Sequence, residues 1–391
     1  MMAGVSESYL IPYGIALGAS SSQVAFLSSI PTLVASILQV KSAGVTQSIG
    51  SRTKLINFVV FFHAVSWLPI ILIPYIFNST AAPMRPWALL LAAVIYMSFG
   101  AFAVPAWQSL MSDTIPTKKR GQYFGWRNRL QGILTVTVSV LAGLLLHFFG
   151  KQSLMGFTII FTFAMICRFL AWMCLTQMTE PFRHSSHDVY FSFIGFLKEM
   201  RTSNFAKFVL FVSLMSFAVN ISSPLLSVFL LRDLGFNYAA YMFVMTTAAL
   251  SGFLFQRLWG AAADTGGNLK ALKIAGWGIA ILPCFWMFSH RLGYLFFVQL
   301  FAGCFWGGFN LLFTNFIIEA VSPEKKIRSI SYFNVMNSFS AVLGASLGGI
   351  LIHRLPPLFG YSFLTLFLIS CGGRVLVMLF LSNRVREVRN A

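Results

Sequence analysis

The chain has 391 residues, of which 57% are hydrophobic and only 10% are charged, and it contains 42 phenylalanines. So few polar side chains cannot cover a water-facing globule of this length, which excludes a water-soluble globular protein. The formal charge of +18 would suit binding to nucleic acid. The basic residues are instead spread over the loops between long apolar stretches, as a diffuse coat on one face of a membrane, so no nucleic-acid partner is expected.

Uncharged stretches long enough to cross a hydrocarbon core of roughly 30 Å recur along the chain. In chain order, the predicted spans cover residues 22–43, 55–77, 87–111, 123–149, 154–178, 206–231, 237–260, 271–290, 292–318, 329–353 and 358–382. A shorter apolar stretch precedes residue 19, and we expect the given chain to begin inside its first helix. Most lysines and arginines lie on the side of the loops after even-numbered helices, which the positive-inside rule makes cytoplasmic.

The sequence contains an internal repeat, which is its most specific signal. Residues 113–128, "DTIPTKKRGQYFGWRN", match residues 319–334, "EAVSPEKKIRSISYFN", at an offset of 206. At an offset of 216, residues 36–44 match residues 252–260. One ancestral unit therefore occurs twice in the chain.

The repeat divides the chain into three predicted parts. A first six-helix bundle covers residues 1–178, with its first helix incomplete, and a second covers residues 206–391. Residues 179–205 are expected to form a cytoplasmic linker that contains an interfacial helix.

Glycines and prolines mark special positions in the predicted helices. Gly303 with Gly307, and Gly344 with Gly348, have the small-xxx-small spacing that lets helix backbones approach closely. Three prolines interrupt predicted helices and are candidate bends: Pro31, Pro105 and Pro224.

Two homologous six-helix halves with basic cytoplasmic loops resemble the major facilitator superfamily of secondary transporters. The family's signature between its second and third helices is present in the second half as Gly260, Asp264, Gly267 and Lys270. The first half keeps Gly44 and Arg52 but has Ser48 at the position of the aspartate. The loop after the fourth helix is also similar to the family's, in Asp113, Arg120, Gly121 and Arg127.

The resemblance implies an all-α membrane fold of twelve helices in two pseudo-symmetric bundles, with these loop residues forming a cytoplasmic gate. Asp264 is expected to approach the start of the fifth helix near Gly121 and Arg127, where unpaired backbone N–H groups attract a carboxylate. In the first half, Ser48 lacks the carboxylate for the pseudo-symmetric contact with the eleventh helix. Alternatively, Asp264 only caps its own loop.

The resemblance also implies a central cavity, whose polar side chains are candidates for binding substrate, because a polar group in hydrocarbon needs a partner. Glu7 is the candidate for binding a cation or a coupling proton, or else a surface residue near the chain end. Asn128 with Gln131, and Asn334 with Asn337, share helix faces, either in the cavity or bonding helices together. Weaker candidates are Trp107, Gln108, Asn220, Ser223, Trp306, Asn310 and Asn315.

Arg168 and Arg374 are repeat partners inside the sixth and twelfth helices. These helices lie outside the cavity in the family. We therefore expect a structural role for both residues rather than binding of an anionic substrate.

These features predict a secondary active transporter that moves a small polar organic solute by alternating access, with H⁺ as the coupling ion. No phosphate-binding loop of the G-x-x-x-x-G-K-[ST] type occurs in the sequence. No cofactor or metal site is expected, since the five cysteines have no ligand spacing. The expected protein is a monomer in the inner or plasma membrane, whose partners are solute, ion and lipid.

Three alternatives remain open. A drug or metabolite efflux antiporter is less favoured, because the fourth helix lacks the embedded arginine of the family's drug antiporters. An intramembrane enzyme would need clustered acids or histidines, and the six histidines are scattered. A non-transporting scaffold or receptor with the same fold is the third alternative.

Overall fold

A computed structural model describes residues 7–77, 81–116, 120–150, 154–180, 203–320 and 326–387. These residues are almost wholly helical, and their only β-type pairing is an isolated bridge between Leu358 and Tyr361. The prediction of an all-α membrane protein is confirmed. The predicted linker lies mostly outside the described residues, as does its interfacial helix.

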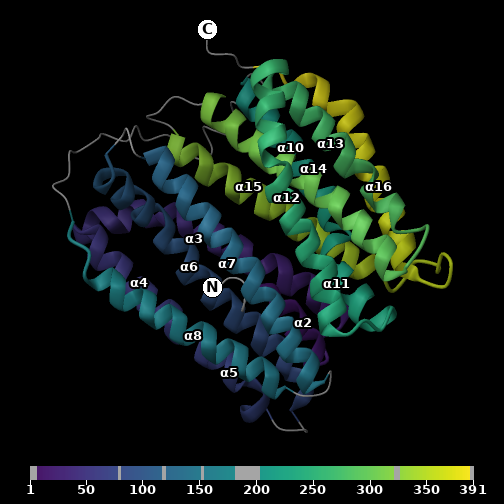
Figure 1. Cartoon of the computed structure of the whole chain (residues 1–391), viewed down its shortest axis with the longest axis horizontal. Helices are drawn as coiled ribbons and strands as arrows, with labels where there is room; N and C mark the ends of the chain where they lie inside the picture. Colours follow the sequence, from purple (N-terminus) through teal and green to yellow (C-terminus); the bar gives the residue numbers. More distant parts are fainter. Residues whose placement is uncertain are drawn as a thin grey trace. The chain divides into compact units, whose positions relative to one another are not determined.

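The chain folds into two compact units. Unit 1 comprises Met1–Ser186 with Asn237–Ala239, and unit 2 comprises His187–Phe236 with Ala240–Ala391. Each unit contains one copy of the sequence repeat. Figure 1 shows the elements of both units in sequence colours.

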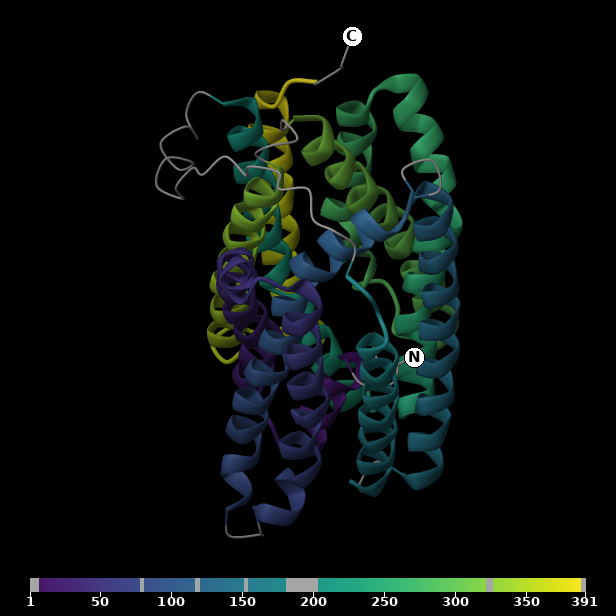
Figure 2. The ribbon, with the colours of Figure 1, turned by 90° about the vertical axis from the view of Figure 1, so that its left-hand side faces the viewer.

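Unit 1 is built of long helices joined by short turns. Its elements are η1 (Glu7–Tyr9), α2 (Leu10–Ala16), α3 (Ser21–Ile49), α4 (Arg52–Val65), α5 (Trp67–Ile76), η2 (Ala82–Met84), α6 (Arg85–Thr114), α7 (Arg120–Phe149) and α8 (Met155–Thr176). Helix α3 packs along α6, and α4 packs against α6 and α8. Figure 2 shows the purple and blue helices of this unit running alongside one another.

Local sequence signals explain several helix ends in unit 1. The side chains of Ser20 and Gln23 form a capping box that begins α3, and Gly50 ends it in the left-handed conformation at φ 71°. The predicted span 55–77 is divided at Ser66, which separates α4 from α5. Its hydroxyl donates to the carbonyl of His63 at 2.8 Å.

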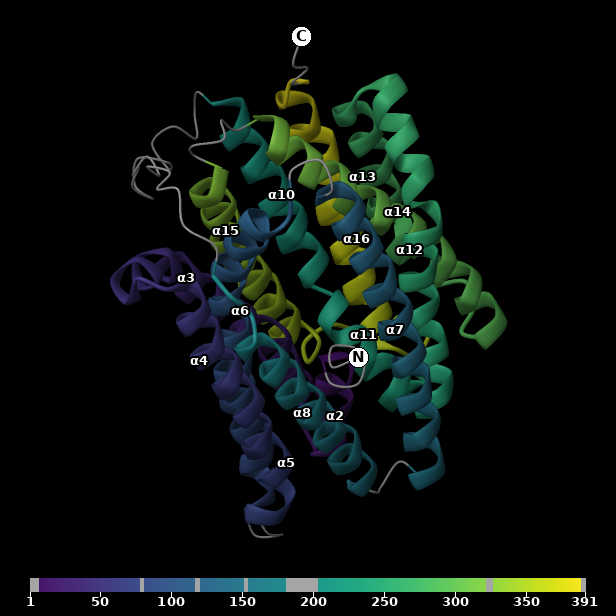
Figure 3. The same cartoon turned by 60° about the vertical axis from the view of Figure 1, so that its left-hand side comes forward.

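Unit 2 has a corresponding set of helices. Its elements are α10 (Asn204–Asn220), η5 (Ser223–Leu225), α11 (Leu226–Val228), η6 (Phe229–Asp233), α12 (Tyr238–Gly266), α13 (Asn268–Phe285), α14 (Leu292–Ala320), α15 (Lys326–Leu351), α16 (Ser362–Leu381) and η7 (Ser382–Arg384). Figure 3 shows α10 and α15 side by side, and these helices pack closely. The core includes the stacked rings of Phe208 and Phe316, with centroids 4.1 Å apart.

Only one of the three candidate prolines coincides with a break. Helices α3 and α6 continue through Pro31 and Pro105. Helix α10 instead ends at Asn220, and Pro224 stands in the short 3₁₀ segment that follows. The predicted bends at Pro31 and Pro105 stay predictions, because a proline can bend a helix that continues through it.

Ten helical segments of the described chain are long and apolar enough to cross a membrane. Helices α2 and α13 are not among these ten. Helix α2 has seven residues, whereas α13 has 18 and begins with two lysines, Lys270 and Lys273, in its first turns.

The helix ends follow the sequence repeat. Thr114 and Ala320 end α6 and α14, and Arg120 and Lys326 begin α7 and α15. Both pairs are repeat partners at the offset of 206. The repeat therefore extends from the sequence to the local backbone structure.

Glycines bring α15 against α10. A Cβ added at Gly344 or at Gly348 would collide with the backbone carbonyls of Phe217 and Ile221, respectively. Gly303 and Gly307 on α14 bear the same relation to the backbone of α12. The predicted packing role of these glycines is confirmed.

Replacing Gly348 with alanine should destabilise the protein. The new methyl group would meet a backbone carbonyl, which cannot swing away as a side chain can, and overpacking of this kind costs about 1–3 kcal/mol. We expect the thermal unfolding midpoint in detergent to fall by several degrees. The control is Gly372→Ala on α16, where a Cβ meets nothing within 4 Å; equal midpoints for the two variants would contradict the packing role.

Candidate functional site

Arg52, the first residue of α4, is the centre of a charged cluster in unit 1. The residue is 1% exposed. Its Nη1 donates to Asp113 Oδ2 at 2.5 Å and to Ser109 Oγ at 3.0 Å, and its Nε donates to Glu180 Oε1 at 2.9 Å. A buried guanidinium needs such acceptors, because an unpaired charge away from water is strongly unfavourable. The cluster joins α4, the end of α6 and the segment after α8.

Glu180 also caps the start of α4. Its Oε1 accepts the backbone N–H of Arg52 at 3.1 Å, and its Oε2 accepts the hydroxyls of Ser51 at 2.7 Å and Thr53 at 3.1 Å. The first N–H groups of a helix have no acceptor within the helix, and the positive end of the helix dipole favours a carboxylate there.

The hydrogen bonds to Glu180 control its protonation. Partial burial alone would raise the pKa of this carboxyl, but the hydrogen bonds from Arg52, Ser51 and Thr53 outweigh burial and lower the pKa to about 2. Glu180 is therefore ionised at any physiological pH.

Unit 2 has a second glutamate cap at the corresponding helix. Both carboxylate oxygens of Glu387 accept the backbone N–H of Leu269 near the start of α13, at 3.2 and 2.9 Å. Gly267 precedes this helix at φ 95°, in the region that favours glycine, and a Cβ there would lie 3.1 Å from Glu387 Oε2. The signature glycine thus leaves room for the carboxylate.

The two capped helices differ in charge. Arg52 and Asn268 are repeat partners at the offset of 216, and each begins its helix. Asn268 donates through Nδ2 to the carbonyl of Leu312 at 3.0 Å. A neutral amide in unit 2 therefore takes the position of the charged guanidinium in unit 1.

The sequence prediction missed both capping glutamates. Each follows the last helix of its bundle, and the two lie one residue from exact register in the 206-residue repeat. This shared position after the last helix was the available signal.

The structure brings three of the predicted gate residues into two contacts, one of them with the candidate binding residue Trp107. Arg52 pairs with Asp113. The guanidinium of Arg127 on α7 lies over the ring of Trp107 on α6, 4.4 Å from its centroid, in a cation–π contact. Both pairs lie within unit 1.

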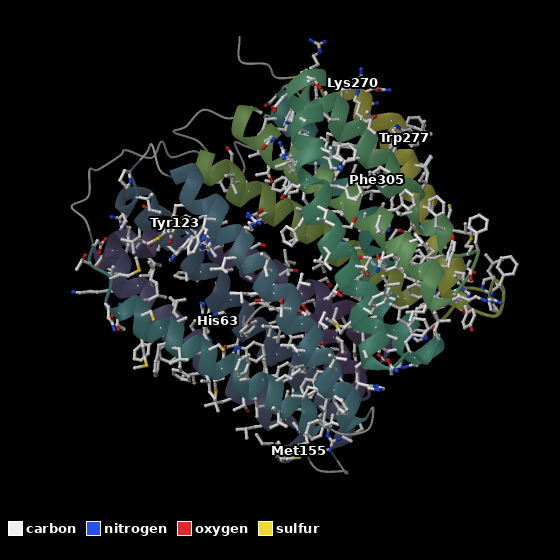
Figure 4. The ribbon with its side chains drawn as sticks, viewed as in Figure 1. His63, Tyr123, Met155, Lys270, Trp277 and Phe305 are labelled. Atoms are coloured by element: carbon white, nitrogen blue, oxygen red, sulfur yellow. The ribbon has the colours of Figure 1, made fainter. Side chains whose placement is uncertain are left out.

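The remaining predicted gate residues occupy helix ends. Lys270 is exposed in the first turn of α13 (Figure 4). Asp264 is exposed on α12, and its predicted contact with the start of α7 joins the two units and stays a prediction. Gly44 and Gly260 are open positions, with nothing within 4 Å of an added Cβ. Arg120 and Gly121 begin α7, and the side chain of Arg120 lies outside the described ones.

Glu7 lies in η1 and accepts a hydrogen bond from the hydroxyl of Tyr96 on α6 at 3.1 Å. The other candidate binding residues divide by exposure. Those exposed are Gln108, Gln131, Ser223 and Asn310; those half-buried are Trp107, Asn220, Trp306, Asn315, Asn334 and Asn337. The side chain of Asn128 lies outside the described ones.

Two of the half-buried amides differ in their bonding. Asn220 donates to the carbonyl of Ser216 at 2.8 Å, one turn back along its own helix. The Oδ1 atom of Asn337 is buried and has no hydrogen-bond partner among the described residues. Asn337 is therefore the more suitable of the two for binding another molecule.

Cysteine positions differ from the sequence expectation in one respect. Cys284 on α13 and Cys371 on α16 are free thiols whose sulfur atoms lie 3.1 Å apart. Their spacing in the sequence gave no sign of this proximity. No group of three or more His, Cys, Asp or Glu residues in the described chain is placed to hold a metal ion.

Replacing Glu180 with glutamine should destabilise unit 1 by about 2 kcal/mol, because hydrogen bonds to a charged group are lost and Arg52 stays buried. The pKa of the carboxyl is lowered in the folded protein from about 4.5 to about 2. Its contribution to stability is therefore complete above pH 4.5 and is lost as the pH falls toward 2.

The measurement is the thermal unfolding midpoint of wild type and Glu180→Gln in detergent between pH 8 and pH 3. The difference between the two proteins should be constant from pH 8 to 5 and should narrow below about pH 4.5. Asp264→Asn, at an exposed acid on α12 in unit 2, serves as the control. A difference that has already vanished at pH 6 would contradict the ionised cap.

Comparison with known proteins identifies the family. A sequence model of the Major Facilitator Superfamily matches residues 1–221 and 208–391. The fold is similar to that of the nucleoside transporter NupG, with a TM-score of 0.75 and 14% identity over 98% of this chain and 97% of that one. It is equally similar to a D-xylose-proton symporter, with a TM-score of 0.75 and 13% identity over 99% and 94% of the two chains.

One curated relative matches part of the sequence. It is the efflux pump azaK of Aspergillus niger, 33% identical over 93 residues, which are 24% of this chain and 20% of that protein. This match spans a fifth of the pump's length, whereas the match to the family model covers all 391 residues of this chain. This multi-pass membrane protein belongs to the Major Facilitator Superfamily of transporters.

Proposed function

We propose that the protein is a secondary active transporter that moves a small polar organic solute by alternating access, coupled to a proton gradient. The observation that carries the proposal is the exposure of amide side chains on spanning helices. Gln108, Gln131 and Asn310 are exposed within the segments that cross the membrane. An amide in contact with hydrocarbon is unfavourable, so these side chains favour a path open to water and solute.

The composition of this candidate path suggests the class of solute. The exposed groups are amides, and the half-buried Trp107 and Trp306 add aromatic surface. Amides donate and accept hydrogen bonds, and aromatic rings stack on flat or apolar faces of a solute. A weakly charged solute with several hydroxyl or amide groups fits this chemistry better than a strongly ionic one.

The glutamate caps support the alternating-access part of the proposal. Transport of this kind requires each bundle to keep its shape while it moves against the other. Glu180 and Glu387 each tie the end of a unit back to the start of its third helix. Each bundle is thereby closed on itself by contacts that do not involve the other.

Glu7 is the proposed site of proton coupling. It is hydrogen-bonded to Tyr96, a residue that is 1% exposed on α6. Glu7 itself is exposed, and a carboxyl group can change between charged and neutral forms as its surroundings change. The basic loops favour the cytoplasmic side of an inner or plasma membrane for the predicted gate residues. The proposed mechanism needs one copy of the protein.

A second candidate is an efflux antiporter, which the partial match to a fungal efflux pump favours. The two candidates predict opposite responses to a proton gradient. A symporter accumulates solute in liposomes when the outside is acidic, whereas an antiporter does so when the inside is acidic.

The test uses purified protein in liposomes, with uridine, D-xylose and L-alanine as labelled probes. We expect at least one probe to be exchanged by the protein and to be accumulated against its gradient when a pH difference is imposed. The sign of the pH difference that drives accumulation distinguishes symport from antiport. A protein that exchanges none of a wider panel of neutral metabolites would instead support the non-transporting scaffold.

Glu7→Gln should abolish accumulation driven by the pH difference but retain exchange of labelled solute across the membrane, because exchange needs no net proton movement. The measurement compares both rates in the same liposome preparation. Asp233→Asn, which removes an acid elsewhere in the membrane region, should retain both. Unchanged accumulation in Glu7→Gln would refute the assignment of Glu7.

A further inference from the structure

The two repeat-related arginines differ in their surroundings. Arg374 on α16 is 5% exposed. Its Nε donates to Ser370 Oγ at 3.1 Å, its Nη1 to the carbonyl of Ile279 at 3.1 Å, and its Nη2 to Ser222 Oγ at 3.3 Å. Nη2 also approaches the carbonyl of Val219 on α10 at 3.5 Å, so neutral acceptors from three helices satisfy this guanidinium. Arg374 joins α10, α13 and α16, which is a sufficient structural role.

Arg168 on α8 has the same place in unit 1 but another set of neighbours. Its Nε atom is buried and has no hydrogen-bond partner among the described residues. Arg168 interacts electrostatically with His63, Tyr96 and Glu7. A charge in the membrane interior is held by such partners or is not tolerated.

The repeat shows which substitutions make the difference. At the offset of 216, His63 occupies the position of Ile279, and Glu7 occupies the position of Ser223. Ionisable side chains in unit 1 thus replace neutral groups in unit 2. Packing alone does not require this, because unit 2 holds its arginine without them.

His63 lies at the centre of this group. It is 4% exposed, and its ring centroid is 4.4 Å from that of Tyr96 (Figure 4 labels His63). Its Nδ1 atom is buried without a partner among the described residues. A Cβ added at Gly100 of α6 would lie 3.2 Å from Nε2, so the glycine makes room for the imidazole.

The helices packed against α4 supply the groups that face His63. Helix α8 supplies Arg168, and α6 supplies Tyr96, whose hydroxyl donates a hydrogen bond to Glu7. The other charged or titratable residues of the helices around α4 are Lys41 on α3, Tyr75 on α5, Arg85 and Asp113 on α6, and Cys167 and Cys174 on α8. Asp113 pairs with Arg52 at the far end of α4, away from His63.

We propose that Glu7, Tyr96, His63 and Arg168 form a proton-binding cluster in unit 1, which runs from buried His63 and Tyr96 to Glu7 at its exposed end. Glu7 takes the proton, and Arg168 balances the charge of the carboxylate when the proton leaves. His63 and Tyr96 hold the side chains of Glu7 and Arg168 in position. The ionised cluster is neutral overall, with one acid and one guanidinium. Protonation of Glu7 leaves Arg168 without its counter-charge, so the two protonation states favour different arrangements of the bundle. The inference rests on the proton coupling proposed above.

The cluster is tested by the ratio of proton-driven accumulation to solute exchange, measured in liposomes with the probe that the wild-type protein exchanges best among uridine, D-xylose and L-alanine. Arg168→Gln should lower this ratio at least about tenfold, and Arg168→Lys should restore part of it. The double variant Glu7→Gln, Arg168→Gln should lower the ratio no further than the more severe single variant, because both residues act in the same cluster.

Arg374→Gln is the matched control. It removes the repeat partner of Arg168, so it should reduce folded protein, exchange and accumulation together and leave the ratio unchanged. His63→Gln provides a second variant if Arg168→Gln does not fold, and it should also lower the ratio.

The outcomes separate the two proposals. A wild-type protein that exchanges neither the three probes nor any of the wider panel of neutral metabolites overturns the proposed transport and the cluster with it. Wild-type exchange without any response to a pH difference leaves transport standing and overturns the cluster. A proton-driven wild type whose ratio survives both Arg168→Gln and His63→Gln overturns the cluster alone.

Discussion

A carboxylate placed on the unpaired N–H groups at the start of a helix is the interaction on which both units depend. Glu180 bonds to the backbone of Arg52, 128 residues earlier, and Glu387 bonds to that of Leu269, 118 residues earlier. Apolar contact cannot specify these closures, because lipid chains compete equally well for apolar helix surface. A charged hydrogen bond at a helix end is specific in position and direction. Each bundle is therefore closed by polar chemistry at its end, while glycines set the distance between its helices.

The two units use the same backbone positions with different charges. Unit 1 begins its third helix with buried Arg52, paired with Asp113 and Glu180, where unit 2 has the neutral Asn268. Burying an ion pair adds little stability compared with a neutral or apolar contact of similar shape. The charge in unit 1 is thus not explained by stability, since unit 2 builds the same helix start without it.

Much of the fold could be predicted from the sequence because lipid imposes a simple rule on it. A spanning helix needs a long apolar stretch, and a repeat needs matching residues. The spans and the two halves can therefore be recognised in the amino-acid sequence. Gly344 and Gly348 also follow a known spacing, and the structure places them against the carbonyls of Phe217 and Ile221. The break between α4 and α5 at Ser66 also has a signal in the sequence, although the predicted span 55–77 runs through it. Pro69 has no N–H to donate to the carbonyl of Val65, four residues earlier, where α4 ends.

The polar sites were harder to predict because they depend on helix rotation and on distant parts of the chain. Arg52 was identified from its loop signature, but its partner Glu180 comes from a segment that follows the last helix of the bundle. His63 and Tyr96 are 33 residues apart in apolar sequence, and nothing in their spacing shows that their rings meet. Arg168 and Arg374 seemed equivalent as repeat partners, and only their neighbours distinguish them.

This difference between equivalent positions separates structural residues from functional ones. Where both copies of the repeat keep the same polar contact, as with the two glutamate caps, the shared fold accounts for it. A polar group present in one copy alone, such as His63 opposite Ile279, has no such explanation. Its burial is unfavourable, and unit 2 shows that the helices pack without it. Ionisable groups in unit 1 alone, around an arginine that unit 2 holds with neutral acceptors, therefore point to chemistry that only the first half performs.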